Sequence, residues 1–117
     1  MLLRYSVIYV HIKGPDEPGH DGNADLKKTI IEDVDRDFFG ELRARIDTQE
    51  IVVSVSADHA TPCTLQAHSD HPVPLLISGD HINRDKSCRF TEHDGSIGSL
   101  GLIGGSDVLR TIFSLGR

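Results

Sequence analysis

The first part of the chain alternates apolar and polar positions in the manner of a strand. Residues 3–12 are rich in β-branched and aromatic side chains, with alternation at Val7, Tyr9 and His11, and the run stops at the breaker Gly14. This pattern predicts a largely buried strand.

Apolar residues then recur every three to four positions, which predicts an amphipathic helix of about six turns. Asn23 or Asp21, at the end of a loop rich in Gly, Pro and Asp, can cap its first turn. The opposite face carries charges of both signs, as solvated faces usually do, and we assign it no function. The apolar face consists of Leu26, Ile30, Ile31, Val34, Phe38, Leu42 and Ile46.

Residues 51–55 form a short, almost continuous apolar run, which is typical of a strand covered on both faces in a parallel sheet. A strand, a crossover helix and a second strand in one sheet pair in parallel through a right-handed connection. The carboxyl ends of both strands then lie at the same edge of the sheet. We therefore predict an α/β fold, with a partly parallel sheet flanked by helices.

The second half of the chain has weaker patterns. A third strand is expected at residues 73–78, irregular at its start because Pro74 cannot donate a backbone hydrogen bond. A weak strand signal lies near residues 89–91, and residues 107–115 predict a C-terminal helix capped by Ser106. With no internal repeat and no low-complexity linker, residues 1–117 are expected to form a single domain with one core.

Composition removes several classes of function. With 12 Lys and Arg residues against 18 Asp and Glu, the net charge is −6; the basic residues form no stripe and aromatic residues are few, which argues against nucleic acid as a partner. The apolar runs fall far short of about 20 residues and no secretion signal precedes them, so a membrane span is excluded. Cys63 and Cys88 stand in no metal or redox spacing, which favours a reducing compartment, the cytoplasm.

Seven histidines are an unusual number for 117 residues, and several of them stand beside aspartates at the ends of predicted strands. Ligands of open α/β sheets collect outside the carboxyl ends of the strands, so the clusters after the first two strands should meet at one edge. A third cluster reaches the same edge if the third strand begins there. The clusters pair Asp16 with His20, Asp58 with His59, and His68 with His71.

Carboxylate and imidazole together are ligands for Zn²⁺ or Mn²⁺, and two such sets can hold a pair of ions about 4 Å apart. Pro18 and Gly19 interrupt the first cluster too strongly for a helical turn, so we expect a tight loop to bring Asp16 and His20 together. Taken alone, the spacing of this pair is a weak motif.

Each of these residues also has a simpler interpretation. Asp16 can start a turn, Asp58 can cap a short helix, and His68 or His71 can bind a backbone carbonyl. Cys63 is expected to be a small buried residue and not a nucleophile. Structural roles are assigned to His11, His81 and His93.

Three segments of the sequence together resemble a known family. They read HIKGPDEPGHDGN at residues 11–23, SADHATPCTLQAHSDHPVPLLI at residues 56–77 and GSIGSLGLIGGSDVLRTIFSL at residues 95–115. These segments resemble the C-terminal part of cofactor-independent phosphoglycerate mutase of the archaeal type, in the alkaline phosphatase superfamily. The resemblance covers nearly the whole chain and implies a fragment of an alkaline-phosphatase-like core with a two-metal site.

The resemblance also assigns ligands. It implies that Asp16, His20 and His68 bind one divalent ion, and that Asp58 and His59 bind the other together with an Asp and a nucleophilic Ser. Those last two residues lie near the N-terminus of the family's full chain and are absent here, so no catalytic nucleophile is expected in this sequence. The ions are expected to be Mn²⁺, Zn²⁺, Co²⁺ or Mg²⁺.

The implied reaction interconverts 3-phosphoglycerate and 2-phosphoglycerate through a phosphoserine, a step of glycolysis and gluconeogenesis. Lys13 could face the substrate phosphate, and His71 would lie close to the ions without binding them; each could equally have a supporting or solvated role.

Because the family's enzymes are several times longer than this chain, the sequence is interpreted as a C-terminal piece whose partner is the missing N-terminal part, inactive alone. Two alternatives stay open: another phosphatase or phosphotransferase of the superfamily, and a non-catalytic metal-binding module.

Overall fold

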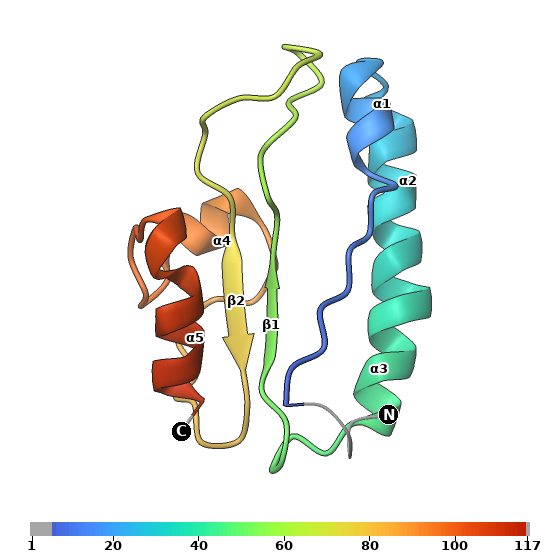
Figure 1. Ribbon diagram of the computed structural model, residues 1–117. Helices are drawn as coiled ribbons and strands as arrows, with labels where there is room; N and C mark the ends of the chain where they lie inside the picture. The colour runs from blue at the N-terminus through green and yellow to red at the C-terminus, as the bar shows by residue number, and fades with distance from the viewer. Residues whose placement is uncertain (1–5, 117) are drawn as a thin grey trace.

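The computed structural model describes residues 6–116. Figure 1 shows two strands in the middle, a column of helices on one side and two shorter helices on the other. In chain order the elements are α1 (Asp16–His20), α2 (Ala24–Asp33), the π-helical segment η2 (Val34–Phe39), α3 (Gly40–Arg45), β1 (Val53–Ser56), β2 (Leu75–Ser78), α4 (Glu92–Ile97), the 3-10 turn η3 (Gly105–Asp107) and α5 (Val108–Leu115).

The predicted long helix forms, as α2, η2 and α3 in direct succession. Asn23 caps it, because its side-chain oxygen accepts a hydrogen bond of 3.0 Å from the backbone N–H of Leu26. The π-helical segment in its middle widens the helix locally, which the 3.6-residue repeat of the sequence does not reveal.

The α/β class is confirmed, but the predicted parallel pairing is absent from residues 6–116. β1 pairs with β2 in antiparallel register, Val53 opposite Ser78 and Ser56 opposite Leu75. Residues 6–13 contain no strand, although their sequence has the pattern of one; residues 3–5 of that predicted strand lie outside the described residues. Apolar alternation indicates that a segment suits a sheet, but a strand also needs a hydrogen-bonding neighbour.

The antiparallel pairing places the end of β1 beside the start of β2. The Ser56 hydroxyl donates a hydrogen bond of 3.0 Å to the carbonyl of Pro74 there. Beyond the ladder, an isolated bridge pairs Ala60 with Ser69, whose N–H donates to the Ala60 carbonyl at 3.0 Å. The third predicted strand thus begins where the second ends, and the second and third His clusters lie at the same end of the strands, as expected.

The segment Asp16–His20 is a helix, so the predicted tight loop is wrong. Pro18 is the third residue of α1, where a backbone N–H has no partner inside the helix and proline costs nothing. Gly19 and Pro18 are both buried. Pro18 and Gly19, which the sequence suggested as helix breakers, are therefore compatible with a short helix that packs closely.

The C-terminal region follows the prediction in part. The expected helix forms as α5, but a 3-10 turn precedes it and Ser106 does not cap it. No strand forms at residues 89–91; instead Thr91 caps α4 by accepting a hydrogen bond from the Asp94 N–H at 3.2 Å. Both cysteines are free.

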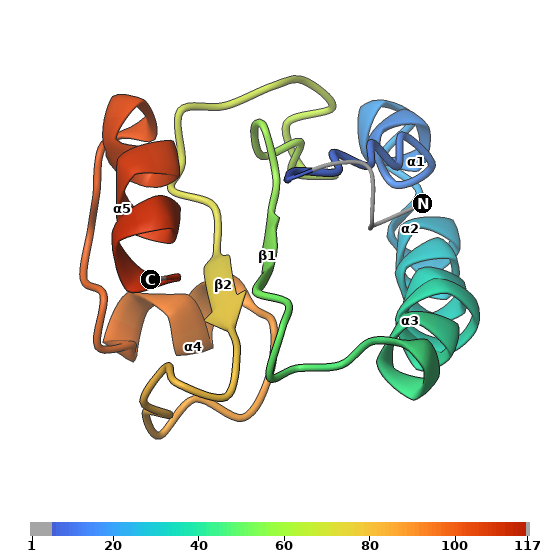
Figure 2. The same cartoon turned by 60° about the horizontal axis from the view of Figure 1, so that its bottom comes forward.

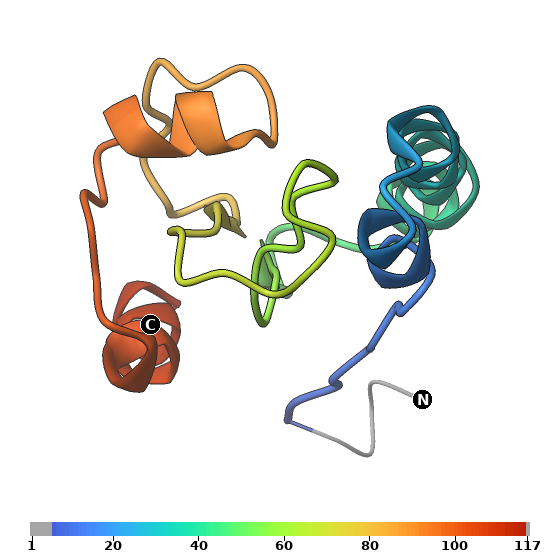
Figure 3. The same cartoon turned by 90° about the horizontal axis from the view of Figure 1, so that it is seen from above.

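The expected single core is missing from the described residues, because no hydrophobic side chain among them is buried. The chain exposes 9393 Å², against about 6,300 Å² for a compact protein of its mass. Its radius of gyration is 15.0 Å, against about 13 Å for this length. In Figures 2 and 3 the α1–α3 column stands to one side of β1, with α4 and α5 on the other.

An open space of about 3410 Å³ is lined by the N-terminal segment, the α2–α3 helix and the two strands. Exposed apolar side chains border it, among them Val7, at 59% exposure, and Ile31, at 49%. None of the helices among residues 6–116 is long and apolar enough to cross a lipid bilayer.

Candidate metal centre

Asp16, His20 and His68 come together at one end of the structure. Oδ1 of Asp16 lies 3.4 Å from Nε2 of His20 and 3.5 Å from Nε2 of His68. One ligand atom from each of the three residues lies within 4.8 Å of the others. Ligands about 2.1 Å from a tetrahedral ion stand about 3.4 Å apart, so the two contacts to Asp16 already have the spacing of a metal site.

Helix α1 positions the first two of these side chains. Asp16 and His20 are four residues apart, which places them on the same face of one helical turn. The other face of α1 packs on the loop after β1: a Cβ on Gly19 would lie 2.7 Å from the carbonyl oxygen of Thr61. The ammonium of Lys27, on α2, donates a hydrogen bond of 2.7 Å to that same carbonyl. Helix and loop are thereby fixed to each other.

The backbone carbonyl of Gln66 orients the imidazole of His20. Its Nδ1 lies 3.4 Å from the carbonyl oxygen of Gln66, and because a carbonyl only accepts, a hydrogen bond there requires the proton on Nδ1. Nε2 is then free for a metal ion, the arrangement usual for metal-binding histidines. Gln66 has φ +52°, a left-handed conformation uncommon for a residue other than glycine.

The second predicted set, Asp58 and His59, lies beside the first without joining it. Nε2 of His59 is 3.5 Å from Oδ2 of Asp58, and Asp58 is largely exposed. The His59 ring stacks on the His68 ring with centroids 3.5 Å apart, and His68 in turn lies 4.8 Å from His20. Among the described residues, no third His, Cys, Asp or Glu side chain joins Asp58 and His59 in a cluster of ligand atoms.

Thr61 joins the two sets and is missing from the sequence-based prediction. Its hydroxyl donates to Oδ1 of Asp16 at 3.0 Å and lies 3.1 Å from Nδ1 of His59. It is 5% exposed, the single buried polar side chain among the described residues. A threonine two residues after a histidine carries no signal by itself, because its role depends on α1 packing against its loop.

The electrostatics of the cluster keep its carboxylate ionised. The hydrogen bond from Thr61 lowers the pKa of Asp16, burial opposes this, and the neighbouring imidazoles His20, His68 and His59 lower it further. A carboxylate has to be ionised to bind a metal ion, so this environment extends the pH range over which Asp16 can do so.

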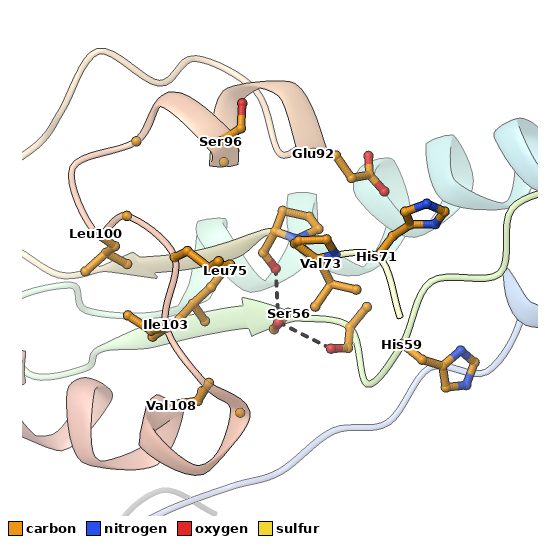
Figure 4. A pocket seen from close by; sticks show the side chains of 18 of the residues that line it. Ser56, His59, His71, Val73, Leu75, Glu92, Ser96, Leu100, Ile103 and Val108 are labelled. Atoms are coloured by element: carbon orange, nitrogen blue, oxygen red, sulfur yellow. Dashed lines mark hydrogen bonds between the residues drawn. The ribbon is translucent and has the colours of Figure 1, made fainter. Parts of the chain in front are cut away.

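Lys13 and His71 lie outside the three-residue cluster. Lys13 is exposed, and its carbonyl accepts the Asp16 N–H at 3.1 Å, which starts α1. Nδ1 of His71 lies 2.7 Å from the hydroxyl of Ser69. His71 also lines a cavity of about 1130 Å³ on the α4 side of the strands. Figure 4 shows His71, His59 and Glu92 at one end of this cavity, with Leu100 and Ile103 at the other.

The comparisons with known proteins agree on one family. The sequence profile of the Metalloenzyme superfamily matches residues 1–114. A protein of Pyrococcus horikoshii named 2,3-bisphosphoglycerate-independent phosphoglycerate mutase is 37% identical over 115 residues. One of the same name from Aeropyrum pernix is 42% identical over 117 residues. These alignments cover 98% and 97% of this chain, but 28% and 27% of the two relatives.

A solved structure of a protein from Pyrococcus horikoshii has the same fold over the aligned region. It matches with a TM-score of 0.93 and 38% identity, over 97% of this chain and 34% of that one. The chain thus spans about a quarter to a third of the length of the relatives that it matches.

Proposed function

This chain belongs to the Metalloenzyme superfamily, and from that premise we propose that it is the C-terminal, metal-binding part of a phosphoglycerate mutase. The observation that carries the proposal is the meeting of Asp16, His20 and His68 at ligand spacing. The names of the relatives, 2,3-bisphosphoglycerate-independent phosphoglycerate mutase, support the choice of reaction.

In this proposal two divalent ions are held side by side. Asp16, His20 and His68 bind the first, and Asp58 and His59 contribute to the second, which another part of the enzyme completes. A mixed set of carboxylates and imidazoles accepts Mn²⁺, Zn²⁺ or Co²⁺, and availability decides among them; Mg²⁺ favours oxygen ligands.

When bound, the ions stabilise negative charge on a transferring phosphoryl group and lower the pKa of the attacking hydroxyl. The side chains of this chain hold the ions and orient the substrate. In this proposal Lys13, three residues before α1, contacts a phosphate oxygen, and His71 donates a hydrogen bond to the substrate. An acidic chain would otherwise repel a phosphorylated acid, and bound cations reverse that local field.

A further polypeptide is expected to cover the apolar surface of this chain. The exposed area exceeds that of a compact protein by roughly 3,000 Å², which lies in the range of permanent interfaces. Residues 6–13 and the edge of β1 that pairs with no strand in the described part of the chain border the open space, so this polypeptide is expected to add strands there. We propose that it is the N-terminal part of the same enzyme and carries the nucleophilic serine.

A chimaeric enzyme tests this function. The segment of the Pyrococcus horikoshii phosphoglycerate mutase that aligns with this chain, 28% of its length, is replaced by this chain. The chimaera should interconvert 3-phosphoglycerate and 2-phosphoglycerate, because the segment supplies ligands that the rest of the enzyme lacks. His68→Ala in the chimaera should remove the activity, and His93→Ala, a histidine outside the cluster, should retain it.

Two results would contradict the proposal. A folded, metal-loaded chimaera that releases inorganic phosphate from 3-phosphoglycerate without forming the 2-isomer would favour a phosphatase. A chimaera whose mutase activity is unaffected by His68→Ala would exclude the proposed ligand set.

A further inference from the structure

We infer that the Thr61 hydroxyl is the positioning group that fixes the tautomer of His59 and links the two ligand sets into one unit. The inference concerns the metal centre proposed above and rests on that function. Its basis is the chain of contacts from Asp16 Oδ1 through Thr61 Oγ1 to His59 Nδ1, at 3.0 and 3.1 Å.

The donors and acceptors of this chain allow only one assignment. An ionised Asp16 is an acceptor only, so the single proton of the Thr61 hydroxyl goes to Oδ1 of Asp16. The hydroxyl can then only accept from the imidazole, which requires a proton on Nδ1 of His59. In the neutral ring, Nε2 is left with its lone pair, which is the form that binds a metal ion.

The contact of His59 with Asp58 agrees with this assignment. Nε2 of His59 lies 3.5 Å from Oδ2 of Asp58, a distance too long for a strong hydrogen bond but suitable for two ligand atoms around one cation. His20 has the same pattern, with Nδ1 on the Gln66 carbonyl and Nε2 toward Asp16. Both histidines therefore present Nε2, and each is held at Nδ1 by an oxygen of the protein.

Contacts with Lys27 and Gly19 restrict the rotamer of Thr61, so its hydroxyl cannot easily leave its two partners. Its carbonyl accepts from Lys27 at 2.7 Å, and the position of a Cβ on Gly19 lies 3.0 Å from its methyl group, Cγ2. Its side chain is nearly excluded from water, so a hydroxyl that lost either partner would have no solvent to replace it. Orienting partners of metal ligands typically change metal affinity by about 10–100-fold when they are removed.

The test begins with ¹⁵N NMR of the histidine rings in the metal-free chain, at about pH 8.5, where a free imidazole is neutral. In the wild type, His59 should be protonated at Nδ1, and in Thr61→Val the Nε2–H tautomer should appear. Thr61→Ser keeps the hydroxyl and should restore the wild-type tautomer. Thr29→Val, which makes the same change on the exposed face of α2, should leave His59 unaltered.

A Mn²⁺ titration of the same proteins provides the second readout. We expect Thr61→Val to weaken Mn²⁺ binding at the Asp16 set by about 10-fold or more, and Thr61→Ser to remain within about 3-fold of the wild type. If circular dichroism shows that Thr61→Val is unfolded, the role of Thr61 is tested by the His59 tautomer of the wild type and of Thr61→Ser.

The two proposals can fail separately. A wild-type His59 protonated at Nε2, or without a preferred tautomer, would overturn the role of Thr61 even if Mn²⁺ binds. A wild-type chain with the Nδ1–H tautomer that does not bind Mn²⁺ would leave this inference standing and count against the proposed function.

Discussion

The carboxylates of Asp16, Asp85 and Asp94 accept hydrogen bonds that keep their pKa values below the usual range. For Asp16 the main cause is the hydroxyl of Thr61. For Asp85 the first cause is the N–H of Ser99, and for Asp94 the N–H groups of two consecutive residues. Such bonds favour the charged form, so these side chains remain acceptors, or ligands, at mildly acid pH.

Asp94 gives a pH prediction at this scale. Its Oδ2 accepts the N–H groups of Cys88 and Arg89, each at 2.9 Å, and ties the segment before α4 to that helix. Its pKa is lower in the folded than in the unfolded chain, where it is about 3.9. The stabilisation is therefore complete above that value and is lost as the pH falls through the lowered folded pKa.

The variant Asp94→Asn removes this titration. Urea unfolding followed by circular dichroism from pH 7 to pH 2 should show a lower stability than the wild type at pH 7 and a shallower loss in acid. Asp35→Asn, at an exposed position of η2, is the control and should follow the wild type. If the free energy of unfolding falls as steeply with decreasing pH in Asp94→Asn as in the wild type, the role of this carboxylate is refuted.

At the scale of elements, the site depends on a five-residue helix that packs through a glycine. α1 carries two of the proposed ligands, and its buried Gly19 touches the loop that carries Thr61. A short helix has little stability of its own, so this contact holds α1 in place, while the hydrogen bond from Lys27 joins α2 to the same loop.

Gly19→Ala tests that packing. In a free helix the change would stabilise by about 1 kcal/mol. Here the new Cβ would lie 2.7 Å from a backbone oxygen of Thr61, and overpacking of this kind costs about 1–3 kcal/mol, so we expect net destabilisation. Mn²⁺ affinity should fall as well, because α1 has to move away from the loop.

The matched control is Gly105→Ala, where a Cβ meets no atom within 4 Å. Thermal unfolding and Mn²⁺ titration of both variants provide the comparison. A Gly19→Ala protein as stable as the wild type, with unchanged affinity, would mean that α1 does not depend on this contact.

The elements also show what the sequence can predict. The apolar repeat located the α2–α3 helix, and the observed cap, Asn23, is one of the two residues expected there, because both features depend on residues close together in the chain. The meeting of Asp16 and His20 with His68 was expected from strand ends and from a family resemblance, although through a tight loop and not a helix. The antiparallel pairing and the bridge through Thr61 arise from contacts between distant segments, which periodicity does not encode.

At the scale of the whole molecule, residues 6–116 have the helices and strands of an α/β fold, but no hydrophobic side chain among them is buried. Large apolar side chains remain exposed, including Tyr9, at 84%, and Leu109, at 68%. The proposed ligands, by contrast, come from α1 and the loop between β1 and β2, which contact each other directly. We therefore expect the Asp16 set to be organised within this chain and the Asp58 set to await its partner.

Calorimetric titration of the chain with Mn²⁺ tests this claim most directly. We expect one specific Mn²⁺ site in the wild type, its loss in His68→Ala, and little change in Asp58→Ala or in the control His93→Ala. A His68→Ala chain that binds like the wild type, or an Asp58→Ala chain that loses the site, would contradict it.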